Sequence, residues 1–298
     1  MDLIQAIVLG LIQGLTEFLP ISSSGHLFLI PTVMGWNDAG AGFTAVIQLG
    51  TILAVLIYFR KDLGRILSGW FKSFGDPALR KTPEARMGWA VAVGTIPIVI
   101  LGKLLEKKID SDFRSATVVA LTLIGFALLL WIAEKVAKQE RNLDDATPLD
   151  GLKMGLWQCL ALVPGSSRSG CTITGGLFGR FDRETAARFS FLLSVPAIVL
   201  SGLYKLIQER DHLLGSDALP TLVATVIAFV SGYAAISFLM KYLQTRTTAV
   251  FIVYRIVLGA VILALLFMGK IDNKPKHQEV SASSHAVHQT SERARTAS

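Results

Sequence analysis

Long apolar segments, separated by short polar ones, dominate the chain. A helix needs about 20 apolar residues to cross the hydrocarbon layer of a membrane. Six segments approach or reach that length, namely residues 41–59, 87–105, 116–133, 187–207, 218–240 and 249–268. The pattern therefore predicts an all-α integral membrane protein with six transmembrane helices.

One short phrase occurs twice outside these six segments. The first copy is Gly10-Leu11-Ile12-Gln13 followed by Pro20-Ile21-Ser22-Ser23-Ser24-Gly25-His26, and the second is Gly155-Leu156-Trp157-Gln158 followed by Pro164-Gly165-Ser166-Ser167-Arg168-Ser169-Gly170. A repeat of this length indicates two related halves. We expect the halves to cover about residues 1–135 and 150–268.

Each copy interrupts an apolar region that is too short for a full crossing. Residues 1–19 and 152–163 each lead into a polar break, and residues 27–34 and 171–178 follow the two breaks. Irregular backbone at membrane depth is tolerated only where protein or a water-filled cavity surrounds it. The pattern thus predicts two re-entrant helical hairpins. Polar groups are costly at this depth, so their recurrence predicts one polar site built by both halves.

Composition supports the membrane assignment. Hydrophobic residues make up 52% of the 298 residues and charged residues only 17%, which excludes an ordinary soluble domain.

Residues 1–268 are expected to form a single polytopic domain, whereas the polar residues 269–298 are expected to be a disordered tail. The apolar start lacks the basic leader of a cleavable signal, so we expect it to be retained. Cys159 and Cys171 are expected to be packing residues.

The distribution of charge predicts an orientation. Residues 60–86 contain seven Lys and Arg, which places this segment in the cytoplasm by the positive-inside rule. Counting crossings from there puts both termini outside and makes the two hairpins enter from opposite faces, so the repeats are inverted and their tips meet near the midplane. Residues 103–114, with four Lys and Arg on the outside, fit this scheme less well. The net charge of +7 fits a membrane surface, and the absence of interleaved stacking aromatics argues against nucleic-acid binding.

The first polar break holds groups suited to phosphate chemistry. Glu17 lies four residues after Gln13, so both share a helix face. The carboxylate can hold a divalent cation or accept a proton, or can simply pair near a helix end. Ser22 suits a helix cap, and free N–H groups at a helix start bind phosphate. Ser23 and His26, three residues apart, supply a nucleophile and a base.

The second break adds a cation. Arg168 offers a planar fork for phosphate oxygens and stabilises charge in phosphoryl transfer, although it could also serve as the structural partner of Glu17. Arg255, inside a crossing, is expected to snorkel or to pair structurally ahead of any substrate contact. The groups expected to bind substrate are Ser22, Ser24, Gly25, Gly165, Ser166, Ser167, Ser169 and Thr172.

At these residues the chain resembles the undecaprenyl-diphosphate phosphatase, or bacitracin-resistance protein, family. The resemblance covers residues 1–268 and rests on Gln13-x-x-x-Glu17 with the PISSSGH stretch and on the PGSSRSGCT stretch from Pro164 to Thr172. It implies hydrolysis of undecaprenyl diphosphate to the carrier lipid used in cell-wall synthesis. It further implies a bacterial plasma-membrane location with the site open to the periplasmic face. A requirement for a divalent cation (Mg²⁺ or Ca²⁺) is implied too. Catalytic roles are implied for Glu17, Ser23, His26 and Arg168, with Ser167 and Thr172 in support.

Two points qualify the resemblance. The family takes Glu or Gln at the first motif position, and Gln13 is neutral, so a two-carboxylate metal site is not available from this motif. Glu17 and Gln13 can still hold a cation together with substrate oxygens, because Mg²⁺ often has few protein ligands.

The type 2 phosphatidic acid phosphatases have motifs similar to Ser24-Gly25-His26 and Ser167-Arg168. Their Lys/Arg-Pro motif and second His are not visible here, so we interpret the likeness as convergence.

Alternatives remain open at this stage. The same architecture could move an anionic lipid as a transporter or flippase without hydrolysis, which inverted repeats favour, whereas the grouping of Ser, His and Glu favours a phosphatase. For the nucleophile we favour Ser23 activated by His26, with direct attack by His26 as the alternative. The expected partners are a polyprenyl diphosphate and the lipid bilayer. A homodimer is compatible with the sequence but not required by it.

Overall fold

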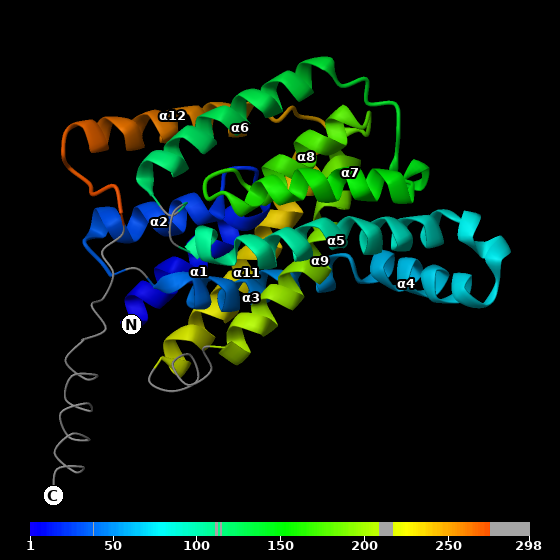
Figure 1. Ribbon diagram of the computed structural model, residues 1–298, viewed down its shortest axis with the longest axis horizontal. Coiled ribbons are helices and arrows are strands. Elements are labelled where there is room, and N and C mark those ends of the chain that lie inside the picture. The colour runs from blue at the N-terminus through cyan, green and yellow to red at the C-terminus, as the bar shows by residue number, and fades with distance from the viewer. Residues whose placement is uncertain (38, 111–112, 114, 209–216, 275–298) are drawn as a thin grey trace, which may run out of the picture.

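The computed structural model describes residues 1–274 apart from residues 38, 111–112, 114 and 209–216 (Figure 1). Within this part of the chain the secondary structure is helical, without a β-strand. The helices are α1 (Leu3–Phe18), α2 (Ser23–Met34), α3 (Gly40–Tyr58), α4 (Arg60–Gly75), α5 (Pro83–Asp110), α6 (Ala116–Val136), α7 (Pro148–Cys159), α8 (Arg168–Phe178), α9 (Arg183–Gln208), α11 (Ala218–Leu243) and α12 (Ala249–Phe267). Short 3₁₀ turns η1 (Pro77–Lys81), η2 (Leu143–Asp145) and η3 (Leu160–Leu162) join some of them.

Five of the described helices, α5, α6, α9, α11 and α12, are long and apolar enough to cross a membrane. This confirms the multi-pass membrane assignment and five of the six predicted crossings. The sixth, α3, meets the same test only together with α4, and the two helices are bent by 80° at their junction. The apolar pattern ends this crossing at residue 59 and indicates a basic loop over residues 60–86, whereas the structure begins helix α4 at Arg60.

The two short helices that precede the polar breaks begin in the same way. Asp2 caps α1 through its side chain, and the side chain of Gln5 bonds back to the cap, which is a capping box. Thr147 and Asp150 form the same reciprocal pair at the start of α7. At 16 and 12 residues, α1 and α7 are too short to cross a membrane.

Close packing against a long helix also recurs in both halves. α1 packs against α11, and α7 packs against α5. A Cβ atom at Gly10 would lie 2.4 Å from the carbonyl oxygen of Ala224, and one at Gly155 would lie 2.1 Å from that of Gly94. The glycine that opens each copy of the repeated phrase therefore lets two backbones approach closely, as small residues do between membrane helices. α6 runs beside α12 (Figure 1).

The end of α1 is fixed by aromatic packing. The ring of Phe18 is almost fully buried and meets the ring of Phe191 on α9 edge-on, with the centroids 5.3 Å apart. Phe59, at the junction of α3 and α4, is 6.1 Å from Phe191 by the same measure. Because Phe18 is adjacent to Glu17, this cluster holds the last turn of α1 in place.

Two further sequence expectations concern the cysteines and the tail. Both cysteines are free thiols, Cys171 buried and Cys159 half-buried. After α12 the chain contacts α6, where Asn273 accepts hydrogen bonds from the N–H groups of Ala116 (2.8 Å) and Thr117 (3.0 Å). Residues 275–298, the rest of the predicted disordered tail, lie outside the described residues.

Candidate active site

The two polar breaks adopt the same local structure. Ser22 and Ser167, the residues that cap α2 and α8, have φ values of 74° and 70°, a left-handed conformation that costs energy for a residue with a side chain. The hydroxyl of Ser22 accepts the N–H of Gly25 at 3.2 Å, and that of Ser167 accepts the N–H of Gly170 at 3.1 Å. Both serines, predicted to bind substrate, are thus helix caps, which is the alternative that the sequence left open for Ser22.

The two tips, residues 19–26 and 164–170, bond directly to each other. Ser24 accepts the N–H of Gly165 at 3.3 Å, and Ser169 donates to the carbonyl of Leu19 at 3.1 Å. Ser24 and Ser169 occupy matching positions in α2 and α8, so the bonds run in both directions between the halves. The N–H groups in the first turn of each helix have no partner within the helix and carry the positive end of its dipole. The described contacts thus bring the N-termini of α2 and α8 together, and such helix ends are suited to anions.

Arg255 joins the tips from a third helix. Its side chain is fully buried and its guanidinium donates to five backbone carbonyls. Among them are those of Pro20 at 3.4 Å, Gly165 at 3.2 Å and Ser166 at 2.8 Å, which belong to the two tips. Arg255 therefore has the structural role that the sequence ranked first, but it does not snorkel to the membrane surface.

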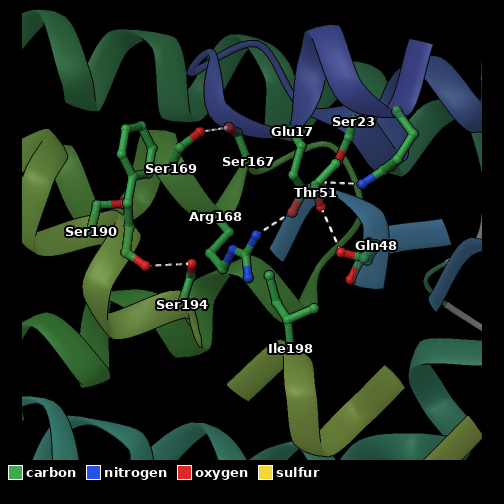
Figure 2. A network of polar contacts seen from close by, with 12 residues as sticks. Glu17, Ser23, Gln48, Thr51, Ser167, Arg168, Ser169, Ser190, Ser194 and Ile198 are labelled. Atoms are coloured by element: carbon green, nitrogen blue, oxygen red, sulfur yellow. Dashed lines mark hydrogen bonds and ion pairs between the residues drawn. The ribbon is translucent and has the colours of Figure 1, made fainter. Parts of the chain in front are cut away.

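Glu17 is the centre of the polar network between the tips (Figure 2). Its carboxylate is buried, and Oε1 forms an ion pair with Arg168, the first residue of α8. Oε2 accepts a hydrogen bond from the hydroxyl of Ser23 at 2.6 Å and another from the amide of Gln13 at 2.8 Å. One carboxylate therefore connects the candidate nucleophile of the first half to the guanidinium of the second half.

His26 has two partners, and neither is Ser23. Nδ1 lies 2.7 Å from the carbonyl oxygen of Ser22, and Nε2 lies 2.6 Å from the hydroxyl of Tyr254. A carbonyl can only accept, so Nδ1 carries the hydrogen and Nε2 accepts from the tyrosine. The two rings are nearly parallel, at 8°, with centroids 5.6 Å apart. The contact expected between Ser23 and His26 is replaced by the one between Ser23 and Glu17.

Tyr254 is the site residue that sequence reasoning missed. It lies on α12, far along the chain from His26, and in the sequence it is one aromatic residue within an apolar crossing. The only available signal was its position next to Arg255, which the sequence did single out.

The remaining predicted substrate groups support the second tip from within. The hydroxyl of Thr172 lies 2.5 Å from that of Ser190 on α9, and the hydroxyl of Ser166 donates to the carbonyl of Val163 at 2.5 Å. Gly165 has φ of 91°, and a Cβ atom there would lie 2.2 Å from the hydroxyl of Thr122. These residues hold the backbone of the tip in shape.

The described residues contain no group of three or more His, Cys, Asp or Glu side chains that could hold a metal ion by itself. Gln13 nevertheless offers a donor beside Glu17. Its Oε1 is buried and has no partner in the described part of the chain, while its amide nitrogen bonds to the carboxylate. An amide oxygen and a carboxylate are ligands suited to Mg²⁺ or Ca²⁺, which can take their other ligands from phosphate oxygens. The residues present thus fit a cation that arrives with a phosphorylated substrate.

Comparison with known proteins identifies close relatives. The profile of the family described as Bacitracin resistance protein BacA matches residues 6–261. The undecaprenyl-diphosphatase of Thermobifida fusca is 52% identical over 270 residues, covering 90% of this chain and 92% of the relative. That of Myxococcus xanthus is 50% identical over 91% of both chains, and that of Chloroherpeton thalassium is 51% identical over 91% of this chain and 99% of its own.

Proposed function

This chain belongs to the bacitracin resistance protein family, and on that premise we propose that it hydrolyses undecaprenyl diphosphate to undecaprenyl phosphate and inorganic phosphate. The relatives named undecaprenyl-diphosphatase support this activity, since they match the chain over nine-tenths of its length. The observation that carries the proposal is the meeting of Ser23 and Arg168 on Glu17 between two helix N-termini. A nucleophile, a proton acceptor and a fixed cation within one anion-binding site are what phosphoryl transfer needs.

Binding would use the positive groups at the two tips. The N–H groups at the starts of α2 and α8 and the guanidinium of Arg168 provide positive potential for the diphosphate. In the described state Arg168 is paired with Glu17. An entering phosphate would compete for this guanidinium and free the carboxylate next to Ser23. Substrate binding would therefore itself make Glu17 available as the proton acceptor for Ser23.

In the reaction the hydroxyl oxygen of Ser23 attacks the terminal phosphorus and passes its proton to Oε2 of Glu17, 2.6 Å away. The bond from this phosphorus to the bridging oxygen breaks, and its electron pair leaves with undecaprenyl phosphate. Water then attacks the phosphoserine and gives its proton to Nε2 of His26, which must first release Tyr254. Glu17 returns the proton taken from Ser23 to the departing serine oxygen, and inorganic phosphate is released. A divalent cation held by Gln13 and Glu17 would neutralise phosphate charge. Direct attack by His26 remains the rival scheme and requires Nε2 to leave Tyr254.

We also propose that the two halves are inverted repeats with re-entrant tips and that the site opens to the outer face. The matching caps at Ser22 and Ser167, the matching glycine contacts of α1 and α7, and the reciprocal bonds between the tips support a two-fold relation. Inverted repeats place their sites near the midplane. The basic segment of residues 60–86 supports the orientation.

Hydrolysis is tested directly by phosphate release from purified protein in detergent with a polyprenyl diphosphate. We expect inorganic phosphate to accumulate in proportion to protein, and release to depend on an added divalent cation. The same preparation of an Arg168→Ala variant controls for contaminating phosphatases. A pure transporter of anionic lipid would release no phosphate, so equal background from both proteins would contradict the proposal.

The orientation is tested with cysteines on exposed segments of opposite sides. Ala78→Cys, in η1, is expected to resist an impermeant thiol reagent applied to intact cells, whereas Lys270→Cys, after α12, is expected to react. Both positions are exposed. The unmodified chain, with its buried Cys171 and half-buried Cys159, supplies the background. The reverse labelling pattern would place access to the site on the cytoplasmic side.

Tyr254→Phe tests whether the tyrosine positions His26. We expect kcat to fall by roughly tenfold with KM little changed, because His26 loses the partner that fixes its ring. Tyr233→Phe, which removes a hydroxyl from α11, is the matched control, and an unchanged kcat in Tyr254→Phe would contradict the role.

A further inference from the structure

Helix α4 leaves the membrane-spanning part of the chain at an angle. It follows α3 after a bend of 80° and packs along α5, and Figure 1 shows α4 projecting from the rest of the helices together with the start of α5. Its packed face is well anchored. A Cβ atom at Gly88 would lie 2.5 Å from the side chain of Trp70, and Ser73 accepts a hydrogen bond from the indole of Trp89 at 3.1 Å. The helix is therefore held rigidly against α5.

A second face of α4 is apolar and uncovered. Leu67, Phe71 and Phe74 are 46%, 63% and 54% exposed. Their spacing of four and three residues places them in one stripe along the helix. An exposed stripe of large apolar side chains on a helix that also carries many charges is typical of a helix that lies in the interface of a membrane.

A third face of α4 is basic. Lys61, Arg65 and Lys72 share this face, and they line a cavity of about 960 Å³ between α4 and the segment from Leu79 to Glu84. The remaining lining residues are Arg60, Asp62, Gly64, Ser68, Gly69 and Thr82.

The acidic groups of this cavity do not neutralise it. Asp62 is engaged by Arg65 at 2.7 Å and by Arg188 of α9 at 2.8 Å. Glu84 is the other carboxylate in the lining. Lys61 and Lys72 have no ion-pair partner in the part of the chain that the structure describes. The cavity therefore keeps an excess of positive charge that is free to bind an anion.

We propose that this cavity binds the phosphate headgroup of an anionic phospholipid, with α4 lying in the membrane interface. The basic face supplies the charge complement to the headgroup, as basic side chains do near anionic lipid surfaces. The neighbouring stripe of Leu67, Phe71 and Phe74 enters the acyl region. A free phosphate has the same charge but makes no use of the stripe, and the stripe is why the geometry points to a lipid. This site lies outside the network around Glu17.

The test measures lipid binding to delipidated full-length protein by native mass spectrometry, using a short-chain phosphatidylglycerol. The expected result is saturable binding that the double variant Lys61→Gln/Lys72→Gln weakens by roughly tenfold or more, because each basic group near an anionic headgroup contributes substantially. Lys135→Gln/Lys138→Gln, which removes the same charge from exposed positions at the end of α6, is the matched control. Equal loss in both double variants, or in neither, would overturn the site.

Two further arms separate the lipid from its rivals. Phe71→Ser/Phe74→Ser should weaken phosphatidylglycerol binding, since only the lipid contacts the stripe. The same variant should leave unchanged any competition between inorganic phosphate and the lipid. Phosphatidylcholine should bind to the unmodified protein no better than phosphatidylglycerol binds to the Lys61→Gln/Lys72→Gln variant. Inorganic phosphate displacing the lipid at equal concentration would show a free-anion site, and equal binding of both lipids would show a merely apolar surface. Either result would overturn the proposal. Phosphate release by each variant confirms that the protein is folded.

Discussion

Arg168→Ala is expected to lower turnover by about a thousandfold or more, the effect found when an arginine that stabilises phosphoryl-transfer charge is removed. The structure places Arg168 at the first position of α8, where its guanidinium pairs with Glu17 across the two halves. Its loss removes the fixed positive charge of the candidate site. It also leaves a buried carboxylate beside Ser23 without its ion-pair partner. Steady-state phosphate release measures the change.

A conservative replacement gives this prediction its sharpest form. Arg168→Lys should recover little activity, because a point charge cannot reproduce the bidentate fork. Near-normal turnover in the lysine variant would show that charge alone suffices. Arg180→Ala is the matched control, since Arg180 forms an exposed ion pair with Glu140 and should contribute little. Size-exclusion profiles of all three variants separate lost catalysis from lost folding.

Ser23→Ala is expected to abolish turnover even though His26 is intact. Ser23 is placed at the start of α2 with its hydroxyl donating to Glu17, so it has both a helix N-terminus and a proton acceptor. A phosphoenzyme trapped by rapid acid quench from the unmodified protein should survive acid, as a phosphate ester does. Radiolabelled terminal phosphate on the substrate makes this adduct measurable.

Companion variants identify the attacking atom. Glu17→Gln removes the acceptor for the hydroxyl proton, and we expect slower formation of the adduct with its acid stability unchanged. His26→Ala should slow its breakdown, so that label accumulates. An acid-labile adduct that persists in Ser23→Ala and disappears in His26→Ala would assign the attack to the histidine.

Much of the architecture follows from hydropathy, because a span in lipid must satisfy its own backbone and so carries a long apolar signal. Helix α4 was not predicted, because it has no such long apolar signal. Its three faces are packed, apolar and basic in turn, so a linear reading of residues 60–75 averages them into a basic loop. The bend between α3 and α4 depends on the packing of Phe59 and Trp70. A window of local sequence does not contain these contacts.

The candidate site was predictable as a set of residues but not as a set of bonds. The repeated phrase indicates that the two tips meet, and the described contacts bring Glu17 and Arg168 together. The spacing of Ser23 and His26 suggested a direct contact, yet the backbone of Ser22 and the distant Tyr254 hold the imidazole elsewhere. Partners that far along the chain are set by how α12 packs, and a single sequence does not report this.

The position of Arg255 has a consequence for how the enzyme is made. A chain leaves the ribosome from its N-terminus, so both tips are synthesised well before the helix that carries this arginine. Until α12 inserts, the carbonyls of Pro20 and Gly165 lack the guanidinium that joins them. Glu17 and Arg168 are then present in the membrane before the guanidinium that bridges the two tips. A nascent chain therefore carries Ser23, Glu17 and Arg168 before it carries the arginine and the tyrosine of α12, and we expect a product truncated before α12 to be inactive.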